Sequence, residues 1–237
     1  MTNLKDVRGL AVYLERRQLA ILLMGFSSGL PIALAGATLS WWLARIGVDK
    51  TSIGLFALVA LPYSLKFLWS PLFDHFHAPG AFKALGRRRG WILLFQVLLI
   101  VAIFMLGTTD PLAAPFLTAF VALLVTTLSA SQDIVVDAYR IDVLSESEQG
   151  AGAASTQTGW RIAFYWVAGA GAQVLSDFLQ WPYIYAIMAG FMLLGVIGTI
   201  IGPEPEEPLE HTGLTVQGRL KEAVVEPFQD FMTRPGW

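Results

Sequence analysis

Three ionisable residues interrupt the end of a long apolar run: Asp133, Asp137 and Arg140, spaced four and three positions apart. On a helix this spacing places them on one face. A carboxylate in hydrocarbon is costly unless it is paired, hydrated or protonated, so such a face normally meets a cavity or another helix. Burial favours the protonated form of an aspartate, which can then load and release a proton as a cavity opens and closes. The pattern therefore indicates proton coupling or gating.

The same residues have a structural interpretation, an ion-pair network around Arg140 at a hydrated helix end. For Asp137 the two interpretations stay open. Asp133 lies deeper and has no cation at helical spacing, which favours the functional one.

Two cations, Lys66 and Arg161, also lie within apolar runs. In a central cavity, an arginine offers a fork for a carboxylate and a lysine a point charge. The alternative is pairing with the aspartates of the run 112–139. Further candidates for contact with a substrate are Gln132, Gln157, Tyr63 and Trp160, although most aromatic residues of membrane proteins are interfacial or packing residues.

Asp74 precedes the basic cluster 87–89 and suits a charge lock that holds a gate closed, with membrane anchoring as the alternative for the arginines. His75 and His77 are too few to predict a metal site, and cysteine is absent. An aspartyl pair usually comes from two helices, so Asp133 and Asp137 do not predict an enzyme. No pattern predicts a cofactor or a nucleic-acid partner.

The elements that must position these residues are membrane helices. Of 237 residues, 55% are hydrophobic and 14% charged, and the mean hydropathy is +0.58; soluble domains have about 25% charged residues. Apolar runs of about twenty residues are long enough to cross a bilayer. We expect an all-α protein with six spans and a cytoplasmic linker carrying an amphipathic helix, at about 19–44, 53–73, 91–107, 112–139, 151–175, 181–201 and 203–237.

The distribution of basic residues predicts the orientation. Most of the 16 Lys and Arg residues fall in the termini, the loop 74–90 and the neighbourhood of Arg140, whereas the opposite side has only Arg45 and Lys50. Because basic residues accumulate on the cytoplasmic side, both termini are predicted to be cytoplasmic.

Five segments together resemble the AmpG family of bacterial muropeptide permeases, which belongs to the major facilitator superfamily. They are GFSSGLP (25–31), KFLWSPLFD (66–74), LGRRRGW (85–91), SASQDIVVDAYRIDVL (129–144) and EQGAGAA (148–154). The eukaryotic acetyl-coenzyme A transporters are similar in the SQD segment. Because this segment is the most recognisable motif of the family, the resemblance gives Gln132, Asp133 and Asp137 the strongest claim to function. The loop motif after the second span is only partly kept, with Pro79 and Phe82 in a longer loop.

The resemblance implies a fold of two six-span halves, each made of two inverted three-helix repeats, of which this chain matches the N-terminal half. It implies proton-driven import of anhydro-muropeptides, GlcNAc-anhydroMurNAc peptides, across the bacterial inner membrane for cell-wall recycling. The implied partners are the substrate, protons, the bilayer and a second six-span half.

Alternatives are a carrier for an acyl-coenzyme A or another anionic conjugate, and a membrane binding or regulatory module without transport. Since alternating access needs two halves, we expect the chain to be a truncated or split transporter, completed by a second chain or, less favourably, by self-association.

Overall fold

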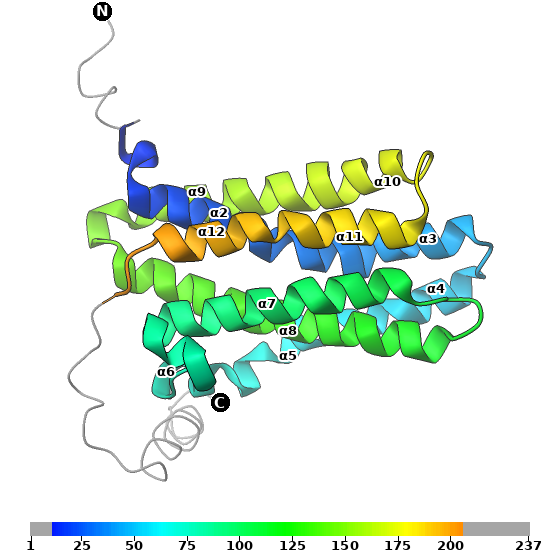
Figure 1. The fold of residues 1–237 in the computed structure, drawn as a ribbon, viewed down its shortest axis with the longest axis horizontal. Coiled ribbons are helices and arrows are strands. Elements are labelled where there is room, and N and C mark those ends of the chain that lie inside the picture. The colour runs from blue at the N-terminus through cyan, green and yellow to red at the C-terminus, as the bar shows by residue number, and fades with distance from the viewer. Residues whose placement is uncertain (1–10, 206–237) are drawn as a thin grey trace, which may run out of the picture.

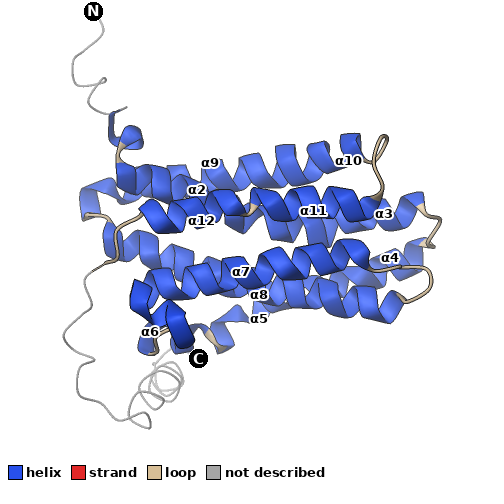
Figure 2. Cartoon of the chain, viewed as in Figure 1, coloured by secondary structure: helices blue, strands red, loops and turns tan. Residues whose placement is uncertain are grey.

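The computed structural model describes residues 11–205, and within this range the chain forms helices joined by short loops, with no strand (Figure 2). The amphipathic helix expected in the linker lies in 206–237, outside the described residues. The longer helices are α2 (Arg16–Ala33), α7 (Arg87–Thr108), α8 (Pro115–Val143), α9 (Gln149–Arg161), α11 (Trp181–Phe191) and α12 (Leu193–Ile201).

Shorter segments extend or connect these helices. They are η1 (Val12–Leu14), η2 (Leu34–Thr38), α3 (Leu39–Arg45), α4 (Lys50–Phe56), η3 (Ala57–Ala60), α5 (Leu61–Leu65), η4 (Lys66–Leu68), α6 (Ser70–His75), η5 (Gly80–Leu85), η6 (Glu146–Glu148), η7 (Ile162–Gly171) and α10 (Ala172–Leu175). Pro31 lies inside α2, and the π-helical turn η2 follows it.

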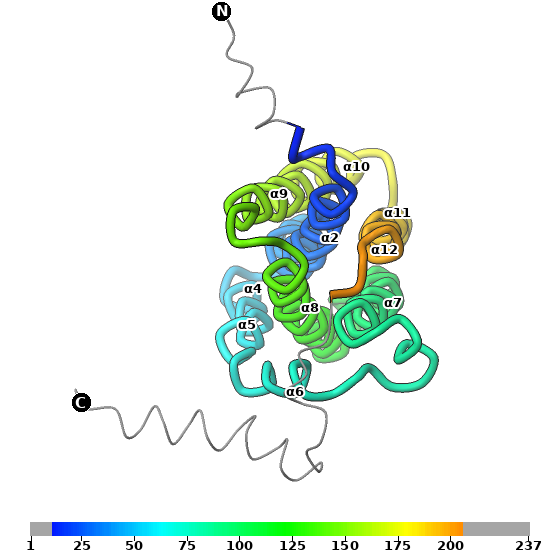
Figure 3. Tube along the Cα trace, turned by 90° about the vertical axis from the view of Figure 1, so that its left-hand side faces the viewer, coloured from blue at the N-terminus to red at the C-terminus, as the bar shows by residue number. Residues whose placement is uncertain are grey.

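The helices lie side by side as an elongated bundle (Figure 1), and the end view shows α2 and α8 between the other helices (Figure 3). Five helical stretches within residues 11–205 are long and apolar enough to cross a membrane: Arg16–Arg45, Lys50–Leu68, Arg87–Thr108, Pro115–Val143 and Trp181–Ile201. The predicted span 151–175 is helical through α9, η7 and α10, but is not among these five. The protein is therefore an integral membrane protein with a helical bundle.

Glycines allow α2 to approach α9 closely. A Cβ atom on Gly25 would overlap the backbone of Thr156, and one on Gly29 would overlap the backbone of Trp160. On the α9 side, a Cβ atom on Gly159 would overlap the backbone of Leu22. In a membrane, where lipid is as apolar as a side chain, such close backbone contact is a main source of helix association.

Two buried tyrosines tie helices together through backbone carbonyls. Tyr185 on α11 donates a hydrogen bond to Leu34 O at 2.9 Å, and Tyr139 on α8 donates to Pro203 O at 2.9 Å. Both rings are fully buried. The second contact lies at the end of the bundle that carries Arg88, which we call the basic end.

Candidate functional site

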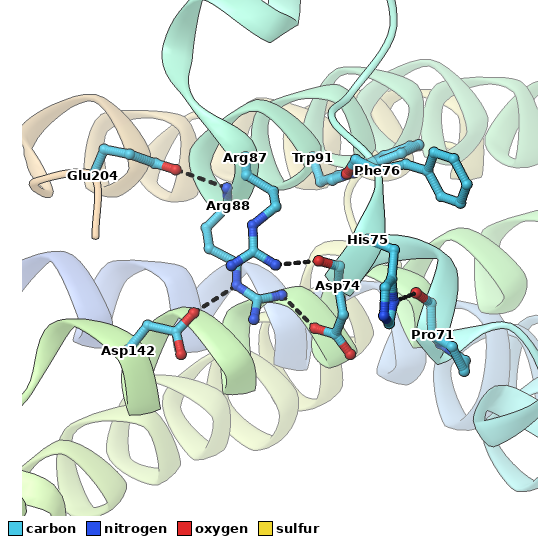
Figure 4. Close-up of polar contacts among 9 residues, drawn as sticks. All are labelled: Pro71, Asp74, His75, Phe76, Arg87, Arg88, Trp91, Asp142 and Glu204. Carbon is cyan, nitrogen blue, oxygen red and sulfur yellow. Dashed lines mark hydrogen bonds and ion pairs between the residues drawn. The ribbon is translucent and has the colours of Figure 1, made fainter. Parts of the chain in front are cut away.

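At the basic end, Arg88 connects three helices through its guanidinium group (Figure 4). Its Nε donates to Asp142 Oδ2 at 2.7 Å, and its Nη1 donates to Asp74 Oδ1 at 2.7 Å. The Arg88 side chain is only 8% exposed, against 44% for Asp74 and 30% for Asp142. A buried guanidinium between two carboxylates is the geometry in which the planar arginine fork is most effective.

The arginine partner of Asp74 was anticipated from the sequence, but Asp142 was not. Asp142 lies at the end of α8, two residues after Arg140 and beyond the predicted span 112–139. The available signal for Asp142 was its spacing of three residues from Tyr139, which places both side chains on the same helix face. We call Asp74, Arg88 and Asp142 the Arg88 cluster.

The loop between α6 and α7 is fixed next to this cluster. Arg87 Nη1 donates to the backbone carbonyl of Asp74, Trp91 Nε1 donates to Phe76 O at 2.7 Å, and His75 Nδ1 lies 2.8 Å from Pro71 O. Figure 4 shows these contacts around the residue Asp74. They hold the end of α6, and with it Asp74, against the first turns of α7.

Glu204 reaches the same place from the other end of the sequence. Its Oε1 accepts a hydrogen bond from the Arg88 backbone N–H at 2.8 Å, and its Oε2 accepts one from the Arg89 N–H at 3.0 Å. Burial raises the pKa of the Glu204 carboxyl, while these two N–H donors act in the opposite direction. Glu204 was expected only as part of the cytoplasmic linker 203–237; its position directly after the last apolar run is the signal that could have found it.

Midway along the bundle, the SQD segment faces α2. Gln132 Nε2 donates to Ser27 Oγ at 3.0 Å and lies 3.4 Å from Ser28 Oγ. Gln132 Oε1 and Asp133 Oδ1 are buried and have no hydrogen-bond partner among the described residues. Because an unsatisfied buried polar atom is costly, these two oxygens mark a place where a water, a proton or a ligand group would be stabilised.

The Asp133 carboxylate lies near the charged side chains of Lys66 and Asp137, and the Ser28 side chain is close to it. The Tyr63 hydroxyl is also near Asp133. The segments that carry Tyr63 (α5) and Lys66 (η4) both contact α8, the helix that holds Gln132 and Asp133. Tyr63 also donates to Ser129 Oγ at 2.7 Å.

An interior chain of hydrogen bonds leads away from Gln132 and was not anticipated. Ser27 Oγ also accepts from Gln96 Nε2 at 3.4 Å, and Gln96 Oε1 accepts from Thr199 Oγ1 at 3.0 Å. Ser27, Gln96, Gln132 and Thr199 are all fully buried. These hydrogen bonds join α2, α7, α8 and α12. A glutamine within an apolar run was the available signal.

The remaining candidate residues predicted from the sequence do not lie together in one site of the protein. Asp137, Gln157 and Arg161 are exposed, and none of the three has a hydrogen bond or ion pair within residues 11–205. Arg140 Nη1 lies 3.3 Å from Gln149 Oε1, and Trp160 stacks on Phe164 with ring centroids 4.6 Å apart. Exposed charges at membrane depth need water or a second protein body beside them.

A helical bundle with ionisable residues inside its apolar stretches is the organisation of polytopic membrane proteins that move solutes. A family of transporters described as "Acetyl-coenzyme A transporter 1" matches residues 18–114.

The chain is 39% identical over 225 residues to the "Anhydromuropeptide permease" of Escherichia coli strain K12, covering 95% of this chain and 44% of that protein. It is 32% identical over 225 residues to "Putative transporter AmpG 4" of Rickettsia felis, covering 94% and 54%. It is 34% identical over 182 residues to "Putative transporter AmpG 1" of Rickettsia conorii, covering 77% and 43%. The chain belongs to the AmpG family and spans about half the length of these curated relatives.

Proposed function

We propose that this chain forms the N-terminal half of a proton-driven transporter that imports anhydro-muropeptides from periplasm to cytoplasm for cell-wall recycling. The substrate class is suggested by the relationship to the permease of Escherichia coli, which extends over 95% of the chain. The observation that carries the mechanism is the Asp133 carboxylate, whose buried Oδ1 lacks a partner among residues 11–205.

For the architecture, we infer six spans in two inverted three-helix repeats, with both termini on the cytoplasmic side of the bacterial inner membrane. The continuous helical stretch α9–η7–α10 supplies a sixth span beside the five candidate spans. The second half of the transporter would cover the exposed Asp137, Gln157 and Arg161 and enclose a cavity with them. Basic residues at the end that holds Arg88 support this orientation.

In this mechanism Asp133 takes up and releases the proton, with Asp137 beside it as a second acidic group. Lys66 and Arg161 bind the carboxylates of the substrate, while Gln157, Tyr63 and Trp160 contact its sugar and peptide parts. The Arg88 cluster holds the cytoplasmic end of the half together, and Arg140 supports the adjacent helix end through Gln149. No step breaks a covalent bond, so the protein acts as a carrier and not as an enzyme.

The test is uptake of labelled anhydro-muropeptide into proteoliposomes under an imposed pH gradient. The chain is assayed alone and together with a chain that supplies six further spans, each with Asp133 or with Asp133→Asn. We expect gradient-dependent uptake only in the paired sample, and loss of uptake with Asp133→Asn. The exposed Glu146→Gln variant is the matched control and should keep uptake. Uptake that Asp133→Asn leaves unchanged would remove the coupling role.

A second candidate is transport of an acyl-coenzyme A or a related anionic conjugate, which the matching family over residues 18–114 favours. Protection of the purified protein by coenzyme A derivatives, with none by muropeptide, would select it. Binding of muropeptide without uptake in either sample would instead support a regulatory membrane module.

A further inference from the structure

The C-terminal end of α12 and the residues directly after it (199–204), which we call the α12 exit, are held by side chains from three other helices. Arg89 Nε of α7 donates to Thr199 O at 2.8 Å, and its Nη2 donates to Ile200 O at 3.1 Å. Arg16 of α2 donates to Ile201 O at 2.5 Å, and Tyr139 of α8 donates to Pro203 O at 2.9 Å. The last carbonyls of a helix have no partner within it, so Arg89 and Arg16 cap α12, and Tyr139 holds Pro203 just beyond the helix end.

The first turn of α7 has the opposite requirement, because its first N–H groups need acceptors. Its N-cap residue is Gly86, which has no side chain to supply one. Glu204 takes that role from outside the helix, with one carboxylate oxygen on the Arg88 N–H and the other on the Arg89 N–H. A carboxylate also interacts favourably with the positive end of the helix dipole.

Gly86 leaves the space that this cap occupies. Its φ of +91° lies in the region that favours glycine. A Cβ atom at Gly86 would in addition overlap the Glu204 side chain at Cδ, Cγ and Oε1. Gly80 has a comparable φ of +64°, but a Cβ atom there would meet no atom within 4 Å. A comparison of alanine substitutions at Gly86 and Gly80 therefore separates the effect of backbone strain from the effect of displacing Glu204.

The two capping contacts are reciprocal: α7 caps the end of α12 through Arg89, and the α12 exit caps the start of α7 through Glu204. The residue whose N–H is held by Glu204 is Arg88, and the Arg88 guanidinium lies between Asp74 and Asp142 (Figure 4). Fixing the backbone of this turn fixes the direction in which the Arg88 side chain leaves it.

We propose that Glu204 is a positioning residue, which aims Arg88 at Asp74 and Asp142 and thereby couples the α12 exit to the Arg88 cluster. A displacement of the segment that follows α12 then withdraws the carboxylate, frees the first turn of α7 and loosens the contacts of Arg88. The chain segment after α12 and the ion pairs of the basic end act as one unit.

The test compares Glu204→Gln with the unchanged 237-residue chain in lipid nanodiscs. A glutamine has one acceptor oxygen where the carboxylate has two, so at least one charge-assisted hydrogen bond is lost. We expect amide hydrogen exchange at Arg88 and Arg89 to become about tenfold faster, and the Nε–Hε resonance of Arg88 to move toward that of a solvated arginine. Glu146→Gln removes an exposed carboxylate at the same end and should change neither signal.

Gly86→Ala displaces the Glu204 side chain from the first turn of α7 without changing Glu204 itself. Gly80→Ala is its matched control. Gly86→Ala should reproduce both changes, whereas Gly80→Ala should leave the Arg88 resonance in place. Because Gly86 and Glu204 act through one contact, the double variant should add little to either single variant.

Two results would overturn the proposal. One is faster amide exchange with an unmoved Arg88 resonance, which would make Glu204 a helix cap without influence on the cluster. The other is equal behaviour of Gly86→Ala and Gly80→Ala. Neither measurement uses uptake, so the outcome is independent of the transport assay above.

Discussion

Replacing Arg88 with lysine tests whether the basic end depends on the guanidinium fork or only on a positive charge. In the structure, Nε reaches Asp142 and Nη1 reaches Asp74, each at 2.7 Å. A lysine ammonium is a single point and cannot occupy both positions. Arg88→Lys should therefore lose one of the two ion-pair hydrogen bonds and keep the other.

The magnitude follows from the burial of the three side chains. Hydrogen bonds to charged groups contribute about 1.5–3 kcal/mol, and the partial exposure of Asp74 and Asp142 favours the lower end of that range. We expect Arg88→Lys to cost about 1.5 kcal/mol and Arg88→Ala about 3 kcal/mol. For a chain of this size, 1 kcal/mol lowers Tm by about 2–4 °C, so the lysine variant should melt about 3–6 °C lower.

The assay is thermal unfolding in one detergent, followed by tryptophan fluorescence, with a double-mutant cycle between Arg88→Lys and Asp142→Asn. Lys83→Ala is the control, because it removes an exposed basic side chain from the neighbouring loop. A coupling energy of about 1 kcal/mol or more is expected for the Arg88 cycle and close to zero for Lys83. An Arg88→Lys variant that melts at the temperature of the unchanged chain would refute the role of the guanidinium fork.

Two further outcomes are expected. Gly159→Ala should destabilise the bundle by about 1–3 kcal/mol, since its Cβ would press on the backbone at Leu22, whereas Gly190→Ala, with open space around it, should melt within about 2 °C of the unchanged chain. The Ser145 hydroxyl, then the Ser145 N–H, hold the pKa of Glu148 below its usual value of 4.5. A lowered folded-state pKa gives stability that is present above pH 4.5 and lost as the pH falls through the lowered value. Amide protection at the start of α9 should fall in that acidic window; an unchanged fall in Glu148→Gln would contradict this assignment.

Several features of this protein could be predicted from the sequence because they depend on distances along the chain. A membrane helix needs about twenty apolar residues, and its backbone groups must be satisfied within the helix. The long apolar runs therefore predicted the helical bundle and the five stretches of residues 11–205 that are long and apolar enough to cross a membrane. An aspartate at the end of one apolar run and a basic cluster before the next likewise predicted that Asp74 meets an arginine, since a single loop joins α6 to α7.

Other features depend on which helix faces meet. Glu204 caps the turn of Arg88 across 116 positions of sequence, and Asp142 reaches the same arginine across 54. The contact of η4, which carries Lys66, with α8 is of the same kind. Helical periodicity gives the face on which a side chain lies, but not the rotation of one helix against another. That rotation is set by packing, where Gly25 and Gly159 let backbones touch, and so only the tertiary structure decided which charges share a site.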